Sequence, residues 1–296
     1  MPARFNAYLP DRAALTRLLE DDRGYRIGRA DDCDLVIEHA SISRHHAELS
    51  AANDGWQLRD SGSKNGVRVD GEPTVAAQLR ASAWFTIGDV YCSLETLDAA
   101  AAARQRDDEE RRRATSRQLS ARFTQARAIG TLLAQALDAV LELSGLERGF
   151  VLYADSGAPL RVRARRGLDA ADLAGAGFNG SAAAVERALA SRDCVVCCDT
   201  DATPWLGLRP SVRLGGIRAI VCVPLLADAA ALGLVYADSR TPGPAITELD
   251  LELIRNAADQ AASALVAQRL NDAIDGLLEQ AAAAGVDAPR WDQLRA

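Results

Sequence analysis

The first part of the chain, up to about residue 97, alternates short apolar runs with turn-forming dipeptides. Four runs rich in β-branched or aromatic residues are predicted strands: Leu35–Ile37, Trp56–Leu58, Val67–Val69 and Trp84–Ile87. Glycine follows Asp54, Asn65 and Asp70, where tight turns need a residue that accepts positive φ. Many short strands separated by such turns predict a β-sandwich or a barrel.

From Asp98 the pattern becomes helical. The charged run 107–113 places an acid four residues before an arginine three times, in the pairs Asp107/Arg111, Asp108/Arg112 and Glu109/Arg113. Each such pair stabilises a helix by about 0.2–0.5 kcal/mol. Residues 98–122 lack a wide apolar face, so we expect a solvated connecting helix there.

The remaining chain mixes helical and strand-like segments. An apolar stripe from Phe123 to Leu141 is expected to dock on a sheet. The predicted strands are Phe150–Tyr153 and Leu160–Ala164, joined as a hairpin across Asp155–Gly157, and then Cys194–Cys198, Ala219–Val223 and Leu232–Ala237. Helices are predicted at Ala182–Ser191 and from Thr247, whose hydroxyl can cap the helix. This arrangement predicts an α+β domain over residues 123–270 and a helical tail over 271–296.

The charge and amino-acid composition of the chain argue against two classes of partner, nucleic acids and membranes. The formal net charge of −7 argues against general affinity for nucleic acid or for an anionic membrane. No apolar run is long enough to span a bilayer, and the N-terminus lacks the apolar stretch of a signal peptide. Six cysteines in 296 residues do not make a disulfide scaffold. We therefore expect a cytoplasmic protein. Lys64 is the only lysine in the sequence.

Four motifs in the first part stand in a fixed order: Gly28-Arg29, Ser43-Arg44-His45-His46, the turn Asp60–Gly66, and Ile87-Gly88-Asp89. In this order and spacing, residues 1–97 resemble a forkhead-associated (FHA) domain, an all-β sandwich that binds phosphothreonine. A phosphate on threonine carries nearly two negative charges, so its receptor needs charge-assisted donors on preorganised loops.

The resemblance implies a role for each matched position. The expected phosphopeptide-binding residues are Arg29, Ser43, Arg44, Lys64 and Asn65. Gly28, His46 and Gly66 are expected to be structural, with His46 bracing the loops by hydrogen bonds. His45 and His46 invite a metal interpretation, but adjacent residues of a strand point to opposite faces and the only other histidine is His39. We expect no metal site and no cofactor.

The second part resembles a GAF domain, a small-molecule-sensing α+β module. The resemblance rests on five segments, namely Leu146–Gly149, Ala188–Asp193, Asp199–Pro204, Leu214–Leu225 and Leu232–Asp238. It implies a candidate ligand pocket bordered by Asp199, Asp201, Trp205, Arg213 and Tyr236. The helices that flank such a domain suit a parallel homodimer seam.

Four cysteines of this part, Cys194, Cys197, Cys198 and Cys222, are candidate redox residues. If residues 194–198 form a strand, Cys194 and Cys198 share one face and Cys197 lies on the other. Cysteine also packs as a small hydrophobic residue, so a structural role is the alternative.

These observations predict a two-domain protein without enzymatic activity, in which a long connecting helix joins the sandwich to the α+β domain. We expect a signalling adaptor that binds a phosphothreonine-containing protein, such as a Ser/Thr kinase or its substrate, and that senses a ligand or dimerises through the second domain. Two alternatives stay open: a redox sensor or methionine sulfoxide reductase-like enzyme, and an architectural protein that binds an unphosphorylated partner. Thr115 follows three arginines and resembles a kinase site, so capture of a phosphorylated linker is a further alternative.

Overall fold

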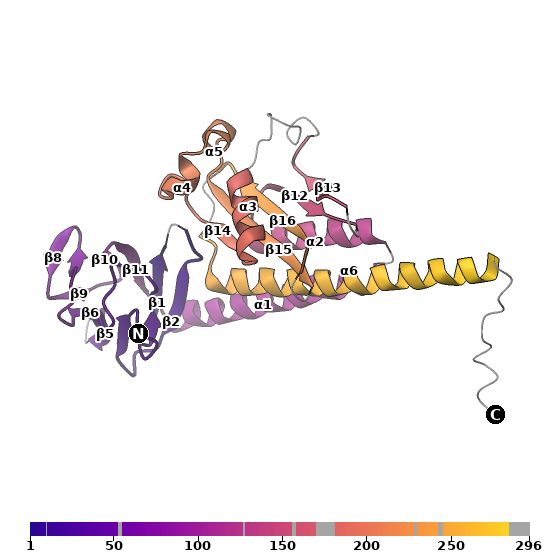
Figure 1. Ribbon diagram of the computed structural model, residues 1–296. Coiled ribbons are helices and arrows are strands. Elements are labelled where there is room, and N and C mark those ends of the chain that lie inside the picture. Colours follow the sequence, from indigo (N-terminus) through magenta and orange to yellow (C-terminus); the bar gives the residue numbers. More distant parts are fainter. Residues whose placement is uncertain are drawn as a thin grey trace, which may run out of the picture.

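The computed structural model describes residues 1–283, apart from residues 10, 53–54, 127, 156–157, 170–180, 228–229 and 242–244. Figure 1 shows an N-terminal β-domain beside a larger mixed domain, with two long helices running along the lower edge of the latter. The predicted two-domain, all-β then α+β architecture is confirmed. None of the described helices is long and apolar enough to cross a membrane.

The N-terminal domain is a sandwich of two sheets. One sheet has the strand order β2-β1-β11-β10-β7-β8 and the other has the order β4-β3-β5-β6-β9. The strands are β1 (Ala3–Tyr8), β2 (Leu15–Leu19), β3 (Tyr25–Gly28), β4 (Leu35–Val36), β5 (Ala47–Ala52), β6 (Gly55–Asp60), β7 (Val67–Val69), β8 (Glu72–Thr74), β9 (Ala76–Leu79), β10 (Ser82–Ile87) and β11 (Val90–Thr96). Alternation of side chains places Phe5, Leu49 and Trp56 in the shared core, where each is fully buried.

The connecting helix α1 (Ala99–Phe123) begins at Asp98, whose carboxylate accepts the N–H of Ala101. Its predicted i,i+4 ion pairs were wrong: Arg111 pairs with Asp108, whereas Arg112 and Arg113 reach across to the last helix of the chain. The charged first part of the helix is mostly exposed, as expected, whereas Leu119 near its end is buried; the burial of Phe123 agrees with the predicted apolar stripe. Arg112 and Arg113 therefore join the connecting helix to the last helix of the chain instead of forming ion pairs within the connecting helix.

The second domain is built on one antiparallel sheet with the strand order β13-β12-β16-β15-β14. Its strands are β12 (Arg148–Tyr153), β13 (Arg161–Arg166), β14 (Val195–Cys197), β15 (Ala219–Ala227) and β16 (Ala230–Ser239), and its helices are α2 (Ile129–Ser144), α3 (Ala182–Ser191), α4 (Pro204–Gly207), α5 (Pro210–Gly215) and α6 (Glu248–Ala283). The predicted apolar stripe is split between α1 and α2, which are separate helices. The expected β12–β13 hairpin is present, while Ser156 and Gly157 of its turn lie outside the described residues.

Apolar side chains fill both faces of this sheet. Helices α2 and α6 cover one face, where Leu137, Val221 and Ile254 are buried in a common cluster. Helix α3 covers the other face, where Phe150 stacks on Tyr236 with ring centroids 4.8 Å apart. Arg148 and Asp238, opposite each other on β12 and β16, form an ion pair whose side chains are 7% and 0% exposed.

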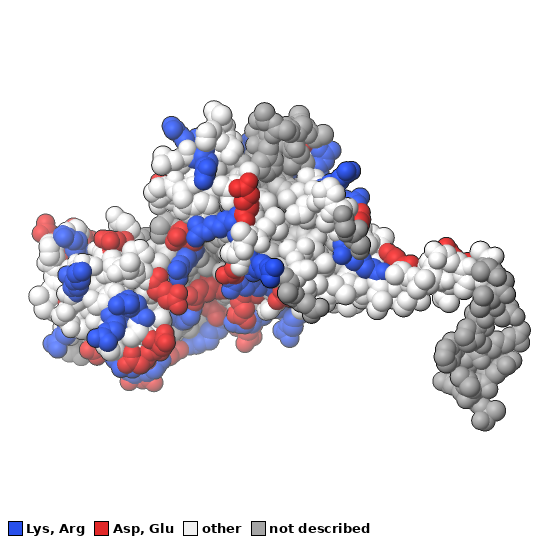
Figure 2. All heavy atoms as spheres, viewed as in Figure 1, with Lys and Arg blue, Asp and Glu red and all other residues white. Residues whose placement is uncertain are grey.

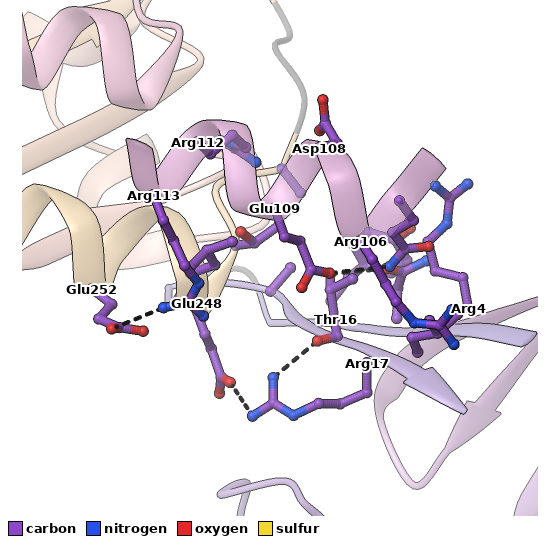
Figure 3. A pocket seen from close by; sticks show the side chains of 18 of the residues that line it. Arg4, Thr16, Arg17, Arg106, Asp108, Glu109, Arg112, Arg113, Glu248 and Glu252 are labelled. Carbon is purple, nitrogen blue, oxygen red and sulfur yellow. Dashed lines mark hydrogen bonds and ion pairs between the residues drawn. The ribbon is translucent and has the colours of Figure 1, made fainter. Parts of the chain in front are cut away.

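The two domains contact each other through main-chain and side-chain bonds. The N–H of Ala14 donates to the carbonyl of Ile246 at 2.8 Å, and the N–H of Glu248 donates to the carbonyl of Ala14 at 3.1 Å. Figure 3 shows the adjacent cleft, where Arg17 of β2 points to Glu248 of α6 and Arg113 of α1 points to Glu252. Thr247 and Asp250 exchange capping hydrogen bonds at the start of α6, as the sequence predicts.

Candidate functional site

The end of β3 is held against the segment that follows Ile42. The N–H of Arg29 donates to the carbonyl of Ser43 at 3.0 Å, and the N–H of Ala30 donates to that of Arg44 at 3.1 Å. This approach is so close that a Cβ on Gly28 would lie 2.0 Å from the carbonyl oxygen of Arg44. Only glycine fits there, so Gly28 brings Arg29 beside Ser43.

His46 joins this segment to the next loop. The ring is fully buried, its Nδ1 accepts the N–H of Ser43 at 3.0 Å, and its Nε2 lies 3.0 Å from the carbonyl of Gly66. Because Nδ1 accepts a proton donor, the neutral ring carries its hydrogen on Nε2 and donates it to Gly66. A neutral imidazole therefore bridges the loops that present Ser43 and Asn65.

The turn between β6 and β7 is organised by Asp60. Its carboxylate accepts the N–H and the hydroxyl of Ser63, at 2.8 and 3.1 Å, and the Ser63 hydroxyl in turn accepts the N–H of Gly66 at 2.9 Å. Gly66 has φ +73°, a left-handed conformation that favours glycine. The turn places the N–H of Lys64 3.0 Å from the hydroxyl of Ser43.

Ser41 organises the same end of the sandwich, although the sequence motifs did not single it out. Its carbonyl accepts the Nδ2 of Asn65 at 2.7 Å, and its hydroxyl accepts the N–H of Asp89 at 2.9 Å. The hydroxyl also lies 2.8 Å from Nδ1 of His39. The only sequence signal for Ser41 was its position two residues before Ser43, because alternate residues of an extended backbone point to the same face.

Three cationic residues adjoin Ser43 through the backbone: Arg29 and Lys64 donate their N–H groups to its carbonyl and its hydroxyl, and Arg44 follows it in the chain. Arg29, Arg44 and Lys64 are all exposed, and none has an ion-pair partner among the residues that the structure describes. Most of the ion pairs lie elsewhere, for example at the domain junction, where Figure 2 shows acidic and basic side chains intermixed. The structure thus brings together the backbone segments of the five residues that the sequence suggested for phosphopeptide binding, and the three cations among them have no ion-pair partner in the described part of the chain.

No pocket in the described part of the second domain is lined by all five candidate residues, although Asp201 and Arg213 line the same small pocket. Asp199 and Asp201 both pair with Arg218, and Arg213 is exposed beside Asp201 at a small pocket. Arg187 lies over the Trp205 ring at 4.4 Å from its centroid. Tyr236 is fully buried on the α3 side, where its hydroxyl accepts the N–H of Ser181 at 3.1 Å.

The four candidate redox cysteines are free thiols on two faces of the sheet. Cys197 and Cys222 are buried on the α3 side, while Cys194 and Cys198 pack on the α2/α6 side, as strand alternation predicts. Burial raises the pKa of all four thiols, to about 11 for Cys198. Since the thiolate is the reactive form, this environment disfavours redox chemistry and favours packing.

Comparison with known families identifies both domains. The FHA domain family matches residues 25–88, and the GAF domain family matches residues 128–265. The chain contains an FHA domain followed by a GAF domain.

Relatives match over the FHA domain. The ABC transporter ATP-binding/permease protein Rv1747 of Mycobacterium tuberculosis is 45% identical over 65 residues, which are 22% of this chain and 8% of that protein. The glycogen accumulation regulator GarA of the same species is 36% identical over 64 residues, 22% of this chain and 40% of that protein. The chain therefore spans less than half the length of either relative.

A solved structure also matches over this region. The FHA domain of the CT664 protein from Chlamydia trachomatis is 28% identical and covers 32% of this chain and 99% of its own, with a TM-score of 0.29.

Proposed function

We propose that this protein is a cytoplasmic signalling adaptor whose FHA domain binds a phosphothreonine-containing partner. The observation that carries the proposal is that three exposed cationic residues, Arg29, Arg44 and Lys64, adjoin Ser43 through the backbone and have no carboxylate partner among the described residues. A phosphate monoester carries about −1.5 to −2 charges at pH 7 and offers three acceptor oxygens, so it is opposite in charge to these side chains and can accept hydrogen bonds from several of them.

Each residue then has a distinct task. The Arg29 guanidinium and the Lys64 ammonium bind phosphate oxygens, and the Ser43 hydroxyl donates a third bond. Asn65 already donates Nδ2 to the carbonyl of Ser41. Its Oδ1 is therefore directed to accept a backbone N–H of the ligand beside the phosphothreonine.

The partner class follows from the chemistry of the site. A phosphothreonine is made by a Ser/Thr kinase, so the partner is such a kinase or one of its substrates. Thr115 is a poor internal ligand, because it is half-buried in the middle of α1 and a captured peptide has to be accessible. The name of GarA, a regulator, agrees with a regulatory role.

Fluorescence titration against an oriented library of phosphothreonine peptides tests this proposal. Arg29→Ala should weaken binding by at least tenfold, since a hydrogen bond to a charged group contributes about 1.5–3 kcal/mol. Arg59→Ala, an exposed arginine on β6, is the matched control and should bind as the wild type does. Equal binding of the unphosphorylated peptides would contradict the proposal and favour an architectural protein that binds an unphosphorylated partner.

For the GAF domain we propose a role in parallel homodimerisation through the projecting half of α6. Five apolar side chains there are 41–65% exposed: Val266, Leu270, Ile274, Leu277 and Leu278. At about 100° per residue they form a stripe that faces away from the side of α6 that packs on the sheet. Figure 1 shows this half extending beyond the domain, so a second copy can reach the stripe.

A further inference from the structure

Three side chains of different chemistry meet beside the phosphate-binding loops. Asp32 and Cys33 lie in the turn after β3, and His45 lies twelve or more residues later, in the segment before β5. One ligand atom of each lies within 4.8 Å of the others. The adjacent residues His45 and His46 do not by themselves predict a metal site. No pattern in the sequence places His45 next to the β3–β4 turn.

The backbone holds these three residues in place. The N–H of Cys33 donates to the carbonyl of Ala30 at 3.0 Å, and the N–H of Ala30 donates to that of Arg44, the neighbour of His45. The Cys33 thiol lies 3.3 Å from the same Arg44 carbonyl. The backbone bonds hold the two segments together independently of any ligand, whereas the bond from the Cys33 thiol to the Arg44 carbonyl is lost when a metal displaces the thiol proton.

The side chains of Asp32 and His45 are oriented toward each other and are accessible to solvent. Nε2 of His45 lies 3.0 Å from both carboxylate oxygens of Asp32, so the carboxylate orients the ring. The side chains of Asp32 and His45 are 60% and 54% exposed, whereas Cys33 is only 7% exposed. The sulfur thus closes the inner side of the group, and the outer side is open to an ion from solvent.

The geometry points to a zinc-type divalent metal site formed by Asp32, Cys33 and His45. Thiolate, imidazole and carboxylate are the donors that Zn²⁺ combines, and three protein ligands leave its fourth position to water. On binding, the Cys33 thiol releases its proton to solvent. The metal takes the place of the hydrogen on Nε2 of His45, and the neutral ring carries its hydrogen on Nδ1 instead.

One neighbouring group opposes the metal. Nη1 of Arg26 lies 3.5 Å from the Asp32 carboxylate, and its Nη2 donates to the Asp32 carbonyl. The guanidinium competes with a cation for this carboxylate. Arg26→Gln should therefore tighten metal binding, an effect that a purely structural role for the three residues does not produce.

The test is a titration of the full, chelator-treated chain with Co²⁺, followed by its thiolate-to-metal absorption band, and with Zn²⁺ by calorimetry. We expect one ion per chain with a sulfur band. Cys33→Ser should abolish the band, and Asp32→Asn and His45→Gln should each weaken affinity more than about tenfold. Cys194→Ser and His39→Gln are the matched controls and should bind as the wild type does.

Asp32 and His45 are exposed, so their variants should fold, which circular dichroism checks. A chain that binds Co²⁺ without a sulfur band, or with a band that survives Cys33→Ser, would overturn the proposal. So would the absence of binding at micromolar protein.

Discussion

Arg112 of α1 forms an ion pair with Asp250, the buried carboxylate that also caps the start of α6. Their side chains are 38% and 5% exposed, so the acid is almost removed from water while the guanidinium stays half-solvated. The contact fastens the connecting helix to the last helix at the point where the FHA domain also reaches α6. The orientation of the two domains therefore depends on a pair of residues far apart in sequence.

Arg112→Ala should lower the free energy of unfolding by about 1–3 kcal/mol, because it removes the ion-pair partner of a buried carboxylate. Urea denaturation measures this loss. Arg111→Ala is the control on the same helix, since its exposed pair with Asp108 contributes only about 0.2–0.5 kcal/mol. Equal effects of the two substitutions would show that the α1–α6 contact does not stabilise the protein.

Gly28→Ala should destabilise the FHA domain and disrupt the candidate site together. The added Cβ would lie 2.0 Å from the carbonyl oxygen of Arg44, a backbone atom that moves only with the Ser43 segment. A cost of at least about 1–3 kcal/mol is typical of such overpacking. Thermal unfolding and phosphopeptide titration measure the two effects.

Gly130→Ala is the matched glycine substitution. A Cβ there meets no atom within 4 Å, and the residue is helical. This variant should be as stable as the wild type or gain up to about 1 kcal/mol. A Gly28→Ala protein that behaves the same way would contradict the close approach of β3 to Arg44.

Stability should fall in alkaline solution between pH 9 and about 11. Burial raises the pKa of Cys198 from 9.0 to about 11 in the folded state, so the unfolded thiol loses its proton first as the pH rises. The stabilising contribution is complete below pH 9 and is lost as the pH passes the folded pKa. Two pKa units correspond to about 2–3 kcal/mol.

Urea denaturation at pH 8 and at pH 10.5 measures this loss, and Cys198→Ala should reduce it. Thiol labelling gives a second readout: the four GAF cysteines should react slowly in the folded chain and fast in urea. Rapid labelling of the native protein would restore the redox-sensor interpretation.

Leu270→Glu and Leu277→Glu should convert a dimer to a monomer in light scattering after gel filtration. Each substitution places a charge in the proposed seam of α6, where a buried unpaired charge is strongly unfavourable. Gln268→Glu adds the same charge on another side of the helix and should leave the dimer intact. A wild-type chain that is monomeric at all concentrations tested would contradict the seam.

The sequence alone determined the elements whose cause is local. Short runs bounded by turn-forming dipeptides predicted strands such as Trp56–Leu58, and the glycines after Asn65 and Asp70 marked turns that need positive φ. Both signals are carried by neighbours along the chain. The resemblance of Gly28-Arg29, Ser43–His46 and Asp60–Gly66 to the FHA motifs, in contrast, implied which distant residues share one end of the sandwich.

Only the tertiary structure decided which distant groups meet. Arg112 has an acid four residues before it, yet it pairs with Asp250, because packing of α1 on α6 offers a buried partner with better electrostatics than an exposed local one. In the same way, Ser41 contacts Asn65 and Asp89, and His45 contacts Asp32, through the pairing of separate strands and loops. Such contacts depend on the summed packing of the core, which no short stretch of sequence encodes.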